Sequence, residues 1–157
     1  MPPADPASAS PVPAITTPST TPSLKPLELS FPLPKTPHTT LHIHLTFLAT
    51  SVMVFITTTS MGDSGGTVKG MGSFVYAIPD RTKPQEILTT SLYPSPSTID
   101  YATRTAKILA RRMSIPVYVG CSVEFEGTTV EEETEGLKKV IDSVIEKWNE
   151  RREGQDG

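Results

Sequence analysis

The chain has 157 residues with a formal net charge of −3, and 36% of the residues are hydrophobic. Most of its prolines precede residue 39, which leaves about 119 residues, enough for one ordinary domain. This length excludes a two-barrel protease or a large α/β enzyme. The weak negative charge gives no general attraction to nucleic acid or to an anionic membrane. No apolar run approaches the roughly 20 residues of a membrane helix, so we expect neither kind of partner.

Residues 1–38 predict a disordered N-terminal arm rich in Pro, Ser and Thr. Frequent prolines remove backbone donors and disfavour helix at the preceding residue. The one apolar patch of the arm, residues 27–31, could dock on the domain or on a partner, but a solvated tail is the preferred interpretation. The predicted boundaries are thus an arm over 1–38, a domain over 39–152 and a frayed tail over 153–157.

The sequence context predicts a reducing compartment, the cytoplasm or the nucleus. The start of the chain lacks the basic segment and apolar core of a signal peptide. The single cysteine, Cys121, excludes an internal disulfide and lies in an apolar segment. A free cysteine in such a place behaves as a small hydrophobic residue, so we expect a buried, inert thiol.

A pattern of alternating residues predicts a sheet from residue 39 onward. One strand alternates apolar residues with His42, His44 and Thr46, which indicates one buried and one exposed face. Residues 52–56 are all apolar, which predicts a strand covered on both sides. Further strands are expected at about 69–78, 85–92 and 117–123. Because the connections between the first four are too short for helical crossovers, we expect antiparallel pairing.

Two amphipathic helices complete an α+β fold with an antiparallel sheet of about five to six strands. The first helix is expected to begin near Ser97 and to end near Arg112, with an apolar stripe that faces the core. The second is expected to begin after Thr128 and Thr129, with a capping box completed by Glu131 or Glu132.

A glycine-rich pentapeptide around Ser64 has the sequence Gly-Asp-Ser-Gly-Gly, as at the nucleophile of trypsin-like proteases. That mechanism needs a histidine base and an orienting carboxylate. All three histidines precede Ser64, but the only acid between His44 and Ser64 is Asp63, inside the motif itself. A loop explains the same residues, so we predict no catalysis and keep a serine hydrolase only as a remote alternative.

Other candidate residues point to binding. His42 and His44 lie on the same side of one strand, but zinc needs three or four ligands and no partner cluster is present, so we expect no metal or cofactor. The first helix carries a basic ridge, which we define as Arg104, Lys107 and Arg111, suited to an acidic protein partner. A solvated helix face is the alternative for this ridge.

The region from residue 90 to 120 resembles the proteasome assembly chaperone 4 family. The similarity lies in a strand that ends with Thr90, Ser91 and Leu92, a polar loop, a helix that ends with Leu-Ala-Arg-Arg, and a strand reading Val-Tyr-Val-Gly from residue 117. Flanking elements extend the resemblance to about 39–150. The arm and the long glycine-rich loop indicate a divergent, fungal-like member.

The resemblance implies a chaperone without enzymatic activity. It implies a heterodimer with a proteasome assembly chaperone 3-like protein, which binds α-type subunits and promotes assembly of the α-ring of the 20S proteasome core particle. An uncovered sheet face or edge needs a partner, and candidates for that contact are Phe74, Tyr76 and the His42/His44 side. A generic small adaptor that shares only the fold is the alternative.

Overall fold

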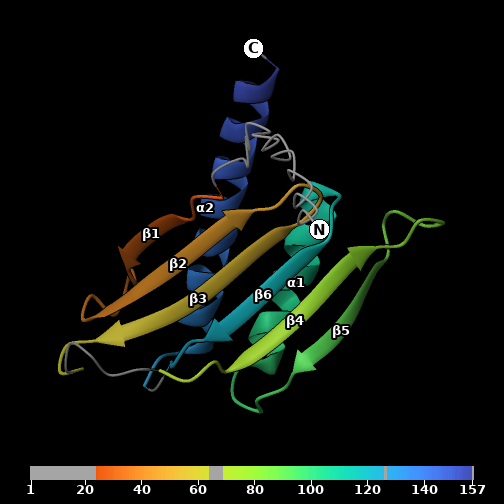
Figure 1. Ribbon diagram of the computed structural model, residues 1–157. Helices are drawn as coiled ribbons and strands as arrows, with labels where there is room; N and C mark the ends of the chain where they lie inside the picture. The colour runs from red at the N-terminus through yellow and green to blue at the C-terminus, as the bar shows by residue number, and fades with distance from the viewer. Residues whose placement is uncertain (1–23, 64–68, 126, 157) are drawn as a thin grey trace, which may run out of the picture.

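Two helices pack on one face of a six-stranded sheet (Figure 1). The computed structural model describes residues 24–63, 69–125 and 127–156. The strands are β1 Leu27–Pro32, β2 Thr39–Phe47, β3 Val52–Ser60, β4 Ser73–Pro79, β5 Ile87–Tyr93 and β6 Val117–Ser122. The helices are α1 Ile99–Met113 and α2 Val130–Gln155. The predicted α+β class is therefore confirmed.

The sheet is mixed, with the strand order β1-β2-β3-β6-β4-β5. Every neighbouring pair is antiparallel except β3 and β6, which run parallel. The prediction of a wholly antiparallel sheet is wrong at this pair. It assumed that β3 and β4 are neighbours, whereas β6 lies between them. The long path through β4, β5 and α1 supplies the crossover that a parallel pair requires.

Strand β1 belongs to the domain, although the sequence placed its residues in the disordered arm. Leu29 pairs with Ile43 and Phe31 pairs with Leu41 across the β1–β2 ladder, and the adjoining Leu33 is only 2% exposed. The apolar patch therefore docks on the domain, because its alternating side chains find cover beneath α2. The disordered boundary at residue 38 is wrong for the segment from residue 27 onward. Residues 1–23 lie outside the described part of the chain, where the arm stays a prediction.

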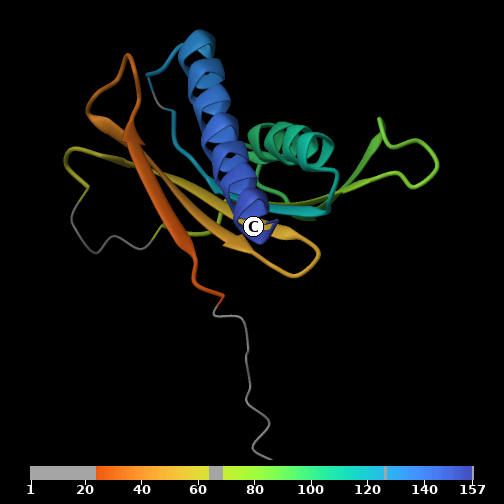
Figure 2. The same cartoon turned by 90° about the horizontal axis from the view of Figure 1, so that it is seen from above.

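The two helices bury opposite halves of the same sheet face. Helix α1 contacts β4, β5 and β6 and buries Ala102, Ala106 and Leu109. Helix α2 lies over the β1–β2 half, where Trp148 packs 5.9 Å from the ring of Phe47 and the Lys139 ammonium lies 4.5 Å from the Phe31 ring centre. Figure 2 shows both helices on one side of the sheet. Within the described ranges, neither helix is long and apolar enough to span a membrane.

The start of helix α2 follows a local capping rule. The predicted capping box of α2 is confirmed: Thr129 accepts a hydrogen bond from the backbone N–H of Glu132, whose carboxylate accepts one from the backbone N–H of Thr129. Helix α2 continues to Gln155, so the predicted tail from residue 153 is wrong up to that point. Helix α1 begins at Ile99, close to the predicted start near Ser97; its N-cap is Thr98, whose side chain makes no capping hydrogen bond.

The opposite face of the sheet has no cover from the described parts of the chain. In β3, Val52, Val54 and Ile56 are buried under the helices, whereas Met53 and Phe55 are partly exposed on the other side. The prediction that this strand is covered on both sides is therefore wrong for the chain by itself. Met53 and Phe55 are therefore apolar residues without a covering neighbour in the described part of the chain.

Candidate protein-binding face

The open face is the side of the sheet turned away from α1 and α2. It collects alternate residues of all six strands, since successive side chains of a strand point to opposite sides. The register places on it Glu28 and Ser30 of β1, His42 and His44 of β2, Met53, Phe55 and Thr57 of β3, Tyr118 and Gly120 of β6, Phe74 and Tyr76 of β4, and Leu88, Thr90 and Tyr93 of β5.

Aromatic rings form a continuous row across the middle of the open face. The ring of Phe55 stacks on that of Phe74 with centroids 6.0 Å apart and planes inclined by 3°. Tyr118 lies 6.0 Å from Phe74 and 4.6 Å from Tyr76, and His44 lies 6.4 Å from Phe55. We call Phe55, Phe74, Tyr76 and Tyr118 the aromatic row. All four rings are partly exposed.

Gly120 makes the aromatic row possible. It lies on β6 opposite Phe55 of β3 on one side and Phe74 of β4 on the other. A Cβ atom at residue 120 would lie 2.4 Å from Cδ1 of Phe55, which is closer than real side chains approach. Glycine thus leaves the space in which Phe55 reaches across β6 to stack on Phe74.

The β1–β2 end of the open face is polar. His42 Nε2 lies 2.8 Å from the hydroxyl of Thr59, and His44 pairs with Glu28 across the ladder. These side chains border a shallow hollow of about 450 Å³, lined also by Ser30, Phe55 and Thr57. The predicted shared side of His42 and His44 is confirmed. In the part of the chain that the structure describes, no three His, Cys, Asp or Glu side chains group as a metal site does.

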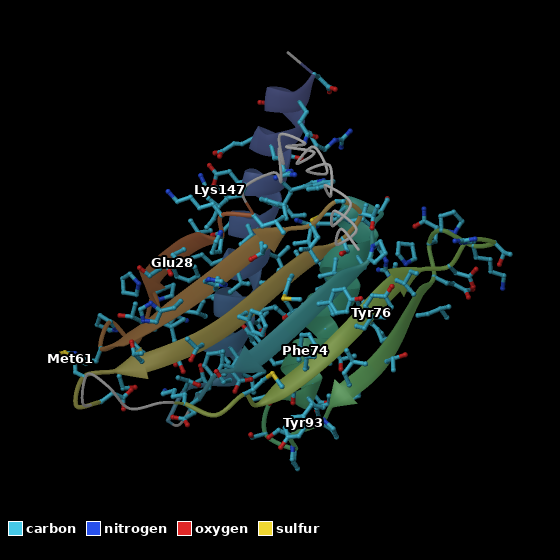
Figure 3. All side chains as sticks on the ribbon, viewed as in Figure 1. Glu28, Met61, Phe74, Tyr76, Tyr93 and Lys147 are labelled. Atoms are coloured by element: carbon cyan, nitrogen blue, oxygen red, sulfur yellow. The ribbon has the colours of Figure 1, made fainter. Side chains whose placement is uncertain are left out.

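The β5 end of the open face is apolar. Leu88 is 55% exposed and Tyr93 is 53% exposed. Figure 3 shows Phe74, Tyr76 and Tyr93 over β4 and β5, with Glu28 at the other side of the sheet and Met61 at a far corner. The open face thus changes from polar at β1 and β2 to aromatic and apolar at β4 and β5.

The structure brings four of the predicted contact residues together and separates the other three. His42, His44, Phe74 and Tyr76 share the open face. The basic ridge of Arg104, Lys107 and Arg111 is exposed on α1, in the helix layer. Within the described ranges no member of this ridge has an ion-pair partner, whereas the neighbouring Arg112 lies 3.6 Å from Asp142. The molecule therefore presents two separate candidate surfaces.

Several residues of the open face were missed by the sequence prediction. Phe55, Tyr118 and Gly120 belong to strands that were predicted, but nothing in one strand says which alternate set meets the helices. Their signal was the run of apolar residues at 52–56, whose second side needs an apolar neighbour. No such neighbour lies in the described part of the chain, so this side of β3 belongs to a candidate binding surface.

The remaining chemical candidates offer no reaction centre among the described residues. Cys121 is 1% exposed, and burial raises the pKa of its thiol to about 11, which agrees with the predicted buried thiol. Ser64 lies outside the described residues. Of the glycines near it, Gly72 leads directly into strand β4, where a Cβ would meet the backbone oxygen of Cys121 at 2.3 Å.

A two-layer domain that leaves a row of aromatic rings on an open sheet face belongs to the class of protein-binding domains. The family model described as Proteasome assembly chaperone 4 matches residues 40–123, from β2 to just beyond β6. The chain belongs to this family and is thus a proteasome assembly chaperone.

A solved structure supports the fold. It is described as "Crystal Structure of a Novel Chaperone Complex for Yeast 20S Proteasome Assembly", and a chain in it is similar to this one with a TM-score of 0.56 and 15% sequence identity. The similarity covers 80% of this chain and 94% of that chain. At this identity the likeness concerns the fold alone. No curated protein sequence matches the chain.

Proposed function

We propose that this chain pairs through its open face with a proteasome assembly chaperone 3-like protein. The heterodimer then binds α-type subunits of the 20S proteasome and promotes assembly of the α-ring, in the cytoplasm and the nucleus. Family membership supports a role in proteasome assembly. The yeast structure of similar fold is described as a chaperone complex, which favours action as part of a complex.

The aromatic row is the observation that carries the proposed pairing. Phe55, Phe74, Tyr76 and Tyr118 stand side by side on the open face and stay partly exposed. Aromatic residues are enriched where proteins bind each other, because they bury a large area with little loss of side-chain entropy. A contiguous patch of this kind is rare on a surface that stays in water. A second sheet laid on this face would cover it.

Co-expression with the chaperone 3-like protein tests the pairing. We expect wild-type chain to elute with it as one complex in size-exclusion chromatography. Phe74→Asp should reduce the affinity at least tenfold, because a carboxylate in an apolar contact loses its hydration. Met61→Asp is the matched control, since Met61 is 80% exposed and lies away from the aromatic row (Figure 3). Equal binding by both variants would remove the open face from the proposal.

The basic ridge is the proposed contact for α-type subunits. Its three cations stand on the exposed side of α1, in the helix layer, and remain accessible when the open face is covered. An acidic patch on a subunit would complement it and would guide association by charge. Such contacts weaken as salt screens them.

Charge reversal tests the ridge. The triple variant Arg104→Glu, Lys107→Glu, Arg111→Glu should bind α-type subunits less tightly at low salt while its unfolding curve stays nearly unchanged. The control triple, Lys25→Glu, Lys138→Glu, Arg152→Glu, changes the net charge equally at exposed sites outside the ridge. Identical loss of binding in both triples would mean that only overall charge matters.

The proposed mechanism is binding alone, with no bond made or broken and no cofactor. A chaperone that promotes assembly must bind the intermediate more tightly than the finished particle, so that it leaves on completion. A pull-down that recovers neither α-type subunits nor a chaperone 3-like protein would favour the generic adaptor. Turnover of a substrate that is lost in Ser64→Ala would favour the hydrolase.

A further inference from the structure

Strand β5 is a sheet edge that no other described segment of the chain covers. It pairs with β4 on one side and ends the sheet on the other. Its residues, Ile-Leu-Thr-Thr-Ser-Leu-Tyr, contain no proline and no charge. Leu88, Leu92 and Tyr93 are each at least 50% exposed. Figure 2 shows the β4–β5 hairpin reaching out beyond α1, so the edge is accessible.

The other edge of the same sheet is protected. Strand β1 follows Pro26, carries Glu28 and ends with Pro32. Prolines and charges on an edge are the ordinary means by which proteins prevent strands from adding to a sheet. The sequence therefore blocks one edge and leaves the other able to pair.

The sequence of β5 reads nearly the same in both directions about Thr90. Two residues away on either side stand Leu88 and Leu92, and one residue away stand the hydroxyl residues Thr89 and Ser91. If two such strands run antiparallel with Thr90 at the centre, Thr89 of each copy faces Ser91 of the other, within the regular part of the strand. In a two-fold symmetric interface the same surface of each copy faces its equivalent, and a strand that pairs with itself in this way meets that condition.

We propose that β5 pairs antiparallel with β5 of a second copy, across a two-fold axis at Thr90, so that one sheet runs through both molecules. Backbone N–H and C=O groups along the edge supply the hydrogen bonds. The register with β4 is regular from Ile87 to Ser91, and the extra residue of the β4–β5 bulge is Leu92. The backbone hydrogen bonds of this contact lie in the plane of the sheet, at its edge, whereas the proposed pairing with the chaperone 3-like protein covers the open face.

Sedimentation velocity of the purified full chain, alone and over a wide concentration range, tests the self-pairing. We expect the wild type to change from one copy to two as concentration rises. Thr90→Lys should weaken this dimer at least tenfold, because the symmetry brings two ammonium groups together. Ser30→Lys is the matched control, since Ser30 is also exposed near the middle of an edge strand. Circular dichroism checks that both variants fold.

A cysteine at the axis gives a second, direct measurement. Thr90→Cys should form a disulfide-linked dimer under mild oxidation, whereas Ser30→Cys should not, and the native Cys121 is buried. Both measurements use the chain alone, without the chaperone 3-like protein, so their outcome is separate from that of the proposed function. A chain that stays single at every concentration, a dimer that Thr90→Lys retains, or equal linking at both sites would overturn the proposal.

Discussion

The two faces of the sheet are built from alternate residues of the same strands, yet they differ in chemistry. The covered face is mostly aliphatic, with Leu41, Val54 and Val119 at most 1% exposed beneath the helices. The open face carries partly exposed aromatic and polar residues, from His44 across Phe55 to Phe74. Gly120 and Cys121 are neighbours in β6 that serve opposite faces. Covered residues should decide stability, and open residues should decide binding.

The largest loss of stability should come from removing strand β1 and the residues that join it to β2. A chain that begins at Thr39 lacks β1 and Leu33, which lies beneath α2 near Gly136. Loss of several buried apolar side chains costs at least about 3 kcal/mol, so we expect this chain to be far less stable in urea than one that begins at Leu24. Unfolding midpoints that agree closely would mean that β1 contributes little, as the solvated-tail interpretation assumed.

A pair of truncations compares the two faces directly. Leu109→Ala, on the covered face, should lower the free energy of unfolding by about 2–5 kcal/mol, because it leaves a cavity. Phe74→Ala, on the open face, should cost less than about 1.5 kcal/mol, since its ring is partly exposed already. Binding of the chaperone 3-like protein should follow the opposite order. Equal stability losses in urea would break the distinction between the faces.

The sequence predicted most elements, because their signals are local. Alternation in 41–47 identified β2 and its exposed histidines, and the box of Thr129 and Glu132 identified the start of α2. The basic ridge on α1 followed from helical spacing alone. These features depend only on residues a few positions apart, which a single sequence contains.

The errors concern contacts between distant segments. Whether Phe31 packs on the domain depends on α2, which lies about a hundred residues later in the chain. The parallel pair of β3 and β6 depends on which strand inserts into the sheet. The aromatic row combines three strands, and the role of Gly120 appears only once Phe55 and Phe74 flank it. No local pattern contains this information, so the open face could be suspected from the sequence but not assembled.

Gly120→Ala changes the open face alone, and we expect it to lower stability less than Leu109→Ala does. The added methyl group would meet Cδ1 of Phe55 at 2.4 Å, so the ring must turn away from Phe74. Such overpacking costs roughly 1–3 kcal/mol. Binding of the chaperone 3-like protein should weaken as well, because the row is broken. A variant that binds normally in calorimetry would mean that the stacked arrangement of Phe55 is not needed.

The smallest effect on stability is expected at Cys121, the neighbour of Gly120 on the covered face. Burial raises the pKa of the Cys121 thiol from 9.0 to about 11, so the folded state holds this proton more tightly than the unfolded state does. The stabilisation is fully present below pH 9 and is lost as pH rises toward 11. Relative to that of Cys121→Ala, the free energy of unfolding of the wild type should therefore fall by about 1 kcal/mol between pH 8 and pH 10. A constant difference in urea unfolding across that range would mean that the thiol is reached by water, and the covered face would then be less closed than its 1% exposure indicates.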